Sequence, residues 1–312
     1  MTAPWLVRPG AGSRVLRRWM SGQLTQGELA ALLILPCLLF LAVFAAYPIV
    51  NAVWTALHTL RLDQPHLGTP FVGLRNFAKA LGDPEAWHAI RVTFLYAGVT
   101  VAAQFALGLA VALIIHPMGR GRGFVRAAAL LPWTMAPVLA GQMWRWLFND
   151  QAGVVNDLLN RLGLISSQII WLGVPALAFF AVTVAATWGA ASYMALILLA
   201  GLQGIPDELY EAASLDGASP VRSFLAVTLP LLRPAIMVSL VLRTLGALQA
   251  LDLPFAMTGG GPGNATETFA LFIYKNTFQF LDFGYGAALS VILVVIALAL
   301  AGTYYRVLAP RD

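Results

Sequence analysis

The chain has 312 residues, of which 59% are hydrophobic and 11% are charged, and its formal net charge is +5. This composition is far from that of a soluble globular protein. One cysteine, Cys37, excludes a disulfide framework within the chain and a thiolate metal cluster, and none of the four histidines pairs with another at metal-ligand spacing.

Apolar segments dominate the chain from about residue 30 onward. Six of them reach the roughly 20 residues that a helix needs to cross the hydrocarbon core of a membrane. They lie near 30–57, 90–115, 124–148, 175–201, 231–251 and 286–308. We therefore expect an all-α, multi-pass membrane protein with six transmembrane helices. Its organisation is an N-terminal segment over 1–28, a transmembrane domain over 29–308 and a short tail over 309–312.

The distribution of arginines predicts the orientation of these spans. Arginines flank the termini and the connection between spans two and three, at Arg8, Arg14, Arg17, Arg18, Arg120, Arg122, Arg126, Arg306 and Arg311. By the positive-inside rule, both termini face the cytoplasm and the loops at 58–89, 149–174 and 252–285 face outward. The first apolar stretch is too long for a cleaved signal peptide, so we expect an uncleaved signal anchor.

Two arginines lie within the predicted spans, where a charged group is a functional candidate. Arg145 lies near the outward end of span three between two tryptophans, and we expect it to reach the interface. Arg243 lies near the middle of span five and must face the bundle interior or an aqueous path. Gly246, Ala247 and Ala250 continue its helical face. Close helix packing by small residues is the alternative explanation of that face.

A polar segment from 204 to about 235 separates spans four and five. Four acidic residues, two of them Glu208 and Glu211, outnumber its arginines, although the loop is cytoplasmic by parity. Docking to a basic protein partner explains this excess better than a merely solvated loop does. Pro206 and the acidic residues after it predict a short helix over 207–216. We expect a left-handed stop at Gly217, and Ser219 as the cap of a second helix.

The glycine-rich run at 259–263 invites comparison with a phosphate-binding loop. Such a loop requires Lys and Ser or Thr after its last glycine. Asn264 follows here, and Lys79 and Lys275 are the only lysines of the chain. We therefore expect a tight outer turn near the substrate entrance and no ATP site in this chain.

Several motifs resemble those of one transporter family. Glu211-Ala212-Ala213, then Gly217, then Val227-Thr228-Leu229-Pro230 resembles the EAA loop of bacterial ABC importer permeases. Asp216-Gly217-Ala218 resembles the version of the carbohydrate importers. Further likenesses lie at 144–149, 153–156, 162–164, 200–206, 253–262, 266–268 and 284–290. The resemblance covers roughly residues 30–308 and is closest to the MalF-like permeases, with trehalose and maltose permeases nearest in kind.

This resemblance implies a type I ABC importer permease with a cytoplasmic coupling helix. The residues expected to couple to the ATPase are Glu208, Glu211, Ala212, Ala213, Leu215, Asp216 and Gly217. The residues expected along the substrate path are Thr187, Trp188, Ala190, Tyr193, Arg243, Gly246, Ala247, Gln249, Ala250, Asp252 and Tyr285. These residues include aromatic and amide side chains and few charged ones, which favours a neutral disaccharide such as trehalose or maltose. The lone positive charge of Arg243 equally suits glycerol phosphate or another small anionic solute.

The resemblance also implies the partners and the compartment. A second homologous permease completes the path, two ATPase subunits bind ATP and Mg²⁺, and an extracytoplasmic solute-binding protein delivers the sugar. The chain is then a transport subunit of the bacterial plasma membrane, with no cofactor of its own and no nucleic-acid partner. A secondary transporter is disfavoured because the spans lack internal acidic residues. An intramembrane enzyme lacks facing catalytic groups, and a receptor or structural protein leaves the EAA spacing unexplained.

Overall fold

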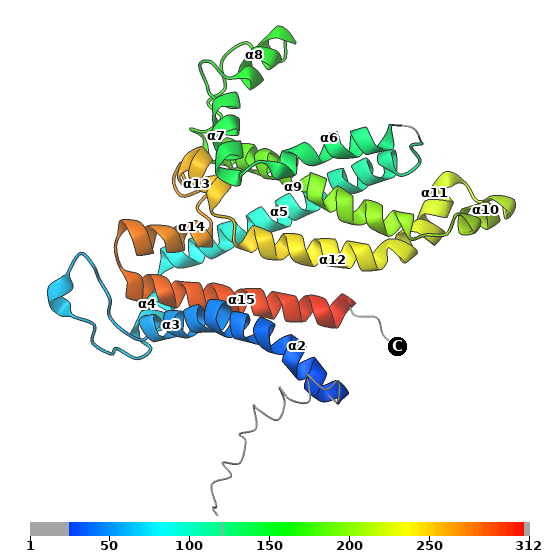
Figure 1. The fold of residues 1–312 in the computed structure, drawn as a ribbon. Coiled ribbons are helices and arrows are strands. Elements are labelled where there is room, and N and C mark those ends of the chain that lie inside the picture. The colour runs from blue at the N-terminus through cyan, green and yellow to red at the C-terminus, as the bar shows by residue number, and fades with distance from the viewer. Residues whose placement is uncertain (1–24, 120, 309–312) are drawn as a thin grey trace, which may run out of the picture. The chain divides into compact units, whose positions relative to one another are not determined.

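A computed structural model describes residues 25–119 and 121–308. In that part of the chain, every regular element is a helix (Figure 1). Two compact units, Met1–Thr55 and Ala56–Asp312, are considered separately. Arg8, Arg14, Arg17, Arg18, Arg120 and Arg311 lie outside the described residues, so the orientation predicted from the arginines stays a prediction.

The described part of the first unit is helical throughout. It consists of α2 (Gln26–Leu41), the π-helical turn η1 (Ala42–Ala46) and α3 (Tyr47–Ala56), whose last residue belongs to the second unit. The π turn ends two residues before Pro48, which has no N–H to close an α-helical hydrogen bond. Residues Leu29–Ala56 are long and apolar enough to cross a membrane.

The second unit contains the remaining helices. In chain order they are η2 (Pro65–Leu67), α4 (Arg75–Gly82), α5 (Pro84–Ile115), α6 (Arg122–Thr134), α7 (Pro137–Leu147), α8 (Val154–Arg161), α9 (Pro175–Gln203), α10 (Asp207–Leu215), α11 (Pro220–Ser223), η3 (Phe224–Thr228), α12 (Leu229–Leu248), α13 (Asp252–Thr258), α14 (Phe269–Tyr274), η4 (Lys275–Gln279) and α15 (Phe283–Leu308). Proline opens α5, α7, α9 and α11, where its missing N–H leaves no intrahelical bond unmade.

Small residues bring the central helices of this unit close together. Helices α5, α9 and α12 run alongside one another (Figure 1). A Cβ atom at Gly108 of α5 would lie 3.1 Å from the backbone oxygen of Ala191 in α9. On the other side of α9, a Cβ atom at Gly201 would lie 2.6 Å from that of Ala235 in α12. Van der Waals packing of this kind holds helices together where lipid removes the hydrophobic driving force.

The prediction of an all-α membrane fold is confirmed, with two corrections to its spans. Among the described residues, five helices are long and apolar enough to cross a membrane. The third predicted span, 124–148, is not continuous, because α6 and α7 meet at an angle of 90°. Pro132 within α6 and Pro137 at the start of α7 interrupt the hydrogen-bond ladder there. The fifth predicted span begins earlier than expected, since the helix runs from Pro220 through η3 to Leu248.

The connecting segments gather at the two ends of the second unit. Helices α10 and α11 lie at one end, and α8, α13 and α14 lie toward the other (Figure 1). Helix α8 is tied down by the buried Asn156, whose Oδ1 accepts a hydrogen bond from the Trp171 indole at 2.8 Å. The segment around 204–235 and the run at 259–263 therefore lie at opposite ends of the bundle.

Candidate functional site

The polar segment between α9 and α12 forms a short helix with a closed C-terminus. Gly217 has a φ of +74°. Its N–H donates to the Ser214 carbonyl at 3.0 Å, and the N–H of Ala218 donates to the Ala213 carbonyl at 2.9 Å. This pair of bonds is the Schellman motif, which satisfies the carbonyl groups at a helix end. The predicted left-handed stop at Gly217 is confirmed.

The next helix and a tyrosine fix α10 to the bundle. The Ser219 hydroxyl accepts a hydrogen bond from the Arg222 N–H at 3.4 Å, which confirms the predicted cap of α11. Tyr210 packs against the core of α9 and α12, and its hydroxyl lies 3.0 Å from the Thr228 hydroxyl of η3. Tyr210 was not among the predicted coupling residues, because nothing in the local sequence shows which side of α10 faces inward.

The outer face of α10 is acidic and exposed. Glu208, Glu211, Ala212 and Leu215 are exposed, as are Asp216 and Gly217 in the turn, while Ala213 is half-buried. Leu215 is 88% exposed. Within residues 25–119 and 121–308, no basic group forms an ion pair with an acidic side chain of this helix. The outer face of α10 therefore presents carboxylates that have no ion-pair partner among the described residues.

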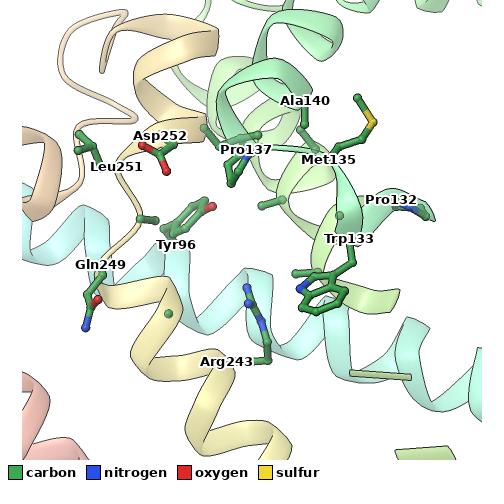
Figure 2. A pocket seen from close by; sticks show the side chains of 17 residues that line it. Tyr96, Pro132, Trp133, Met135, Pro137, Ala140, Arg243, Gln249, Leu251 and Asp252 are labelled. Carbon is green, nitrogen blue, oxygen red and sulfur yellow. The ribbon is translucent and has the colours of Figure 1, made fainter. Parts of the chain in front are cut away.

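The middle of the second unit holds a cavity of about 470 Å³. Its walls come from α5, α6, α7, α9, α12 and α13, and Figure 2 shows it from close by. The lining residues are Tyr96, Pro132, Trp133, Met135, Pro137, Ala140, Ala185, Ala186, Gly189, Ala190, Arg243, Gly246, Gln249, Ala250, Leu251, Asp252 and Leu253. The volume lies within the range of roughly 300–1,000 Å³ for small-molecule sites.

Two interruptions of helical structure meet at this cavity. The break between α6 and α7 places Pro132, Met135 and Pro137 in its wall. The non-helical stretch between α12 and α13 adds residues 249–251. Irregular backbone at membrane depth is tolerated where it is covered by protein or lines a water-filled cavity, because its polar groups need partners. The cavity therefore explains why helical structure can be interrupted at these two places.

Arg243 carries a positive charge into the cavity. Its side chain rises from α12 between Tyr96 and Trp133 (Figure 2). Its Nε donates a hydrogen bond to Oε1 of Gln104 at 3.0 Å, and Nε2 of Gln104 donates to the Ala186 carbonyl at 3.2 Å. Gln104 is only 1% exposed. A buried amide from α5 thus orients the guanidinium of α12.

The structure brings some of the predicted path residues to the cavity and places others elsewhere. Those that line it are Ala190, Arg243, Gly246, Gln249, Ala250 and Asp252. Those that do not are Thr187, Trp188, Tyr193, Ala247 and Tyr285.

The predicted residues that do not line the cavity contact other parts of the structure. Trp188 meets Trp144 edge to face, and Tyr193 stacks on Trp133. Ala247 is buried in a core cluster with Trp171. The Thr187 hydroxyl is buried without a hydrogen-bond partner among the described residues.

Tyr285 lies in a separate cluster with α4 and α5. Its hydroxyl donates a hydrogen bond to Asp83 at 2.6 Å, and the residue is only 1% exposed. Its prediction as a path residue rested on an aromatic side chain near the outer end of span six. The carboxylate of Asp83 instead holds that side chain in the helix packing.

Eleven lining residues were missed by the sequence analysis, among them Tyr96 of α5 and Trp133 at the end of α6. It also missed Gln104 of α5, which does not line the cavity but contacts Arg243. Gln104 was detectable as a lone amide within an apolar stretch, since a buried polar group needs a partner. The identity of that partner depends on how α5 and α12 pack.

A second hollow, of about 540 Å³, lies at the end of the unit that holds α13. Arg145, Asn149, Asp150, Thr258 and Gly259 are among its lining residues. The adjacent glycine-rich run turns tightly, with φ of 62°, 94° and 57° at its first, second and last glycines.

Ion pairs secure the segments at this end. Nζ of Lys275 lies 2.6 Å from Oε1 of Glu267, which is buried, and Lys79 pairs with Asp282 at 3.1 Å. In the loop after α3, a hydrogen bond from Arg61 lowers the pKa of the Asp63 carboxyl and raises the pKa of Arg61. Across the described ranges, no group of three or more His, Cys, Asp or Glu side chains could hold a metal ion.

Comparisons with known proteins agree over nearly the whole chain. A model of the family described as "Binding-protein-dependent transport system inner membrane component" matches residues 31–311. The "Sulfoquinovosyl glycerol transport system permease protein SmoG" of Agrobacterium fabrum is 40% identical, over 95% of this chain and 94% of that protein. The "Trehalose/maltose transport system permease protein MalF" of Thermococcus litoralis is also 40% identical, over 90% of this chain and 94% of that protein.

A solved structure shows the same fold. It is a bacterial ABC transporter involved in the import of the acidic polysaccharide alginate. The similarity has a TM-score of 0.77 at 22% identity, and it covers 95% of this chain and 97% of that chain.

Proposed function

The chain belongs to the family of binding-protein-dependent transport system inner membrane components and is a permease subunit of a sugar ABC importer, and we propose that it conducts a glycoside through the central cavity. The permeases of this family are transport subunits without an ATPase site. The family model and the sugar-importer relatives confirm the resemblance that the EAA spacing predicted.

The observation that carries the proposal is the cavity at the two helix breaks. Its volume of about 470 Å³ accommodates a small glycoside. Trp133 and Tyr96 give its wall aromatic surface, and Gln249 and Asp252 add hydrogen-bonding groups. The size supports a ligand of up to disaccharide length, a class in which trehalose and maltose are the neutral members proposed from the sequence. The charge of Arg243 is a separate property of the same cavity.

The exposed face of α10 supports docking to an ATPase. Glu208 and Glu211 lack basic partners among the described residues, and Leu215 has almost no cover. We propose that two ATPase subunits bind ATP and Mg²⁺ and that one of them receives this face. The chain itself then supplies no group to ATP hydrolysis.

The geometry of α10 supports a transmission of force. The Schellman turn at Gly217 and the bond between Tyr210 and Thr228 fix the helix to α11 and η3, which continue directly into α12. A displacement of α10 then moves α12, which carries Arg243 into the cavity. Closure of the ATPases on ATP is proposed to switch the cavity from inward-open to outward-open.

The remaining parts of the importer follow the family description. An extracytoplasmic solute-binding protein is proposed to deliver the glycoside to the hollow beside α13. A second, homologous permease is proposed to complete the path. The family description supports a multi-pass protein of the inner membrane, and the arginine distribution supports cytoplasmic termini.

The test is the ATPase activity of the importer assembled from both permeases, the ATPases and the binding protein in lipid. The panel contains trehalose, maltose, other glucosides, an acidic glycoside and glycerol phosphate. Stimulation by one or more glycosides supports the proposal. Stimulation by glycerol phosphate alone identifies a different solute, and an assembly without any ATPase subunit overturns the proposal.

A further inference from the structure

In the part of the chain that the structure describes, the guanidinium of Arg243 has no counter-ion. Among the described residues, no carboxylate forms an ion pair with it, and its only hydrogen bond is the one from Nε to Gln104. Asp252 lines the same cavity but is exposed, and among the described residues it forms no ion pair with Arg243.

Gln104 fixes which atoms of Arg243 face the cavity. Its amide nitrogen donates to the Ala186 carbonyl, so its oxygen is turned toward Arg243, where it accepts from Nε. A flipped amide would lose both bonds. Because Nε is occupied, the two terminal amino groups remain for the cavity. Gly246 lies beside them, and a Cβ there would be 3.6 Å from Nη1, so residue 246 places no side chain over that edge.

The charge of Arg243 distinguishes neutral from anionic ligands when a ligand displaces water from the cavity. Water in the open cavity solvates the guanidinium. A neutral sugar that displaces this water leaves the charge with hydroxyl partners only, whereas an anionic group supplies a counter-ion as the water leaves. Two parallel N–H groups of arginine also match the oxygen atoms of a carboxylate, phosphate or sulfonate in a bidentate manner.

We propose that the transported glycoside carries an anionic group, which binds the terminal amino groups of Arg243 in the central cavity, with Gln104 as the positioning residue. This inference rests on the proposed function, since it assumes that the cavity takes a glycoside. The aromatic wall at Trp133 and Tyr96 then faces the sugar ring. Carboxylate, phosphate and sulfonate share the required chemistry, and the experiment separates the first two.

The experiment measures ligand binding to the importer assembled from both permeases and the ATPases in lipid nanodiscs, without the binding protein, whose own selectivity would otherwise enter. Two matched pairs serve as probes: methyl α-glucoside with methyl α-glucuronide, and trehalose with trehalose 6-phosphate. Each pair differs only in the anionic group. We expect at least one anionic member to bind roughly tenfold or more tightly than its neutral partner, since hydrogen bonds to charged groups are the stronger ones.

Three variants assign this preference to its residues. Arg243→Gln removes the charge, and Gln104→Glu places a carboxylate beside it at nearly constant volume. Both should abolish the preference, because the anionic member then finds no free positive charge in the cavity. Arg161→Gln, in the exposed α8, alters the net charge of the chain as Arg243→Gln does and should keep the preference.

The outcomes separate the two proposals. Neutral members that bind as tightly as both anionic partners in the wild type overturn the anionic assignment and leave the glycoside permease standing. A preference that survives in Arg243→Gln also overturns it. A complex that binds no glycoside of either pair overturns the proposed function, and the anionic assignment with it. The wild-type comparison requires no variant, so it decides even if a substitution prevents assembly.

Discussion

Replacing Gly217 by proline should uncouple the importer without removing the chain from the membrane. Proline fixes φ near −65° and has no N–H. It therefore cannot adopt the φ of +74° found at Gly217, and it deletes the donor of the bond to the Ser214 carbonyl. The turn must open, and with it the fixed angle between α10 and α11.

The size of the effect follows from the contacts of this turn. Opening it breaks both Schellman hydrogen bonds, each contributing about 1 kcal/mol. A side chain that keeps the turn closed faces a smaller penalty, since the left-handed backbone costs a non-glycine residue roughly 1–2 kcal/mol and asparagine less than that. No atom lies within 4 Å of a Cβ built at Gly217, so space is not limiting. The expected order of damage is Gly217→Asn, then Gly217→Val, then Gly217→Pro.

The assay is glycoside-stimulated ATPase activity of the lipid-embedded importer, normalised to the amount of assembled complex. Gly217→Asn should retain most of the stimulation, Gly217→Val should lose part of it, and Gly217→Pro should abolish it while unstimulated hydrolysis continues. Full stimulation in the proline variant, or equal loss in the asparagine and proline variants, would show that the turn geometry does not transmit the motion.

Three further substitutions probe other parts of the structure. Glu211→Lys reverses a charge on the exposed face of α10 and should abolish copurification with the ATPase while membrane insertion is unchanged; retained copurification would exclude this face as the contact. Gly108→Leu forces a side chain against the Ala191 backbone and should lower the stability of the chain by about 1–3 kcal/mol. The measurement is the Tm of the purified chain in detergent, which should fall. An unchanged Tm would contradict the close approach of α5 and α9. Lys275→Met leaves Glu267 buried without its cation, which should cost about 3–5 kcal/mol of stability and lower the Tm. Adding Glu267→Gln should recover much of the lost Tm. Equal Tm values for Lys275→Met and the wild type would contradict a buried pair.

The helix stop and the helix cap in the polar segment between α9 and α12 were predictable from local sequence. The stop at Gly217 and the cap at Ser219 depend on a few neighbouring residues, whose conformational preferences hold in any fold. The side of α10 that faces the bundle was not predictable in the same way. It is decided by Tyr210, whose partner Thr228 lies beyond the turn.

Hydropathy located the spans but not their breaks. Residues 124–148 average to an apolar stretch, although Pro132 and Pro137 each remove a donor from the hydrogen-bond ladder of a continuous helix. Across the 90° bend, α6 packs on α9 and α7 packs on α13, and a hydropathy window contains neither contact.

Part of the cavity wall was predictable from the sequence. Helical spacing placed Gly246 and Ala250 on the face of Arg243, and all three line it. The Gln104 contact joins residues 139 positions apart, and such pairings emerge only from tertiary packing. The contact of Tyr285 with Asp83, on a distant segment, was unpredictable for the same reason.

The decisive measurement is ATP-dependent uptake of labelled glycosides by proteoliposomes that contain the two permeases and the ATPases, with ATP inside and the loaded binding protein outside. We expect uptake of at least one glycoside that requires ATP and is lost in Gly217→Pro. Uptake without ATP, or undiminished uptake in that variant, would contradict an importer driven through α10.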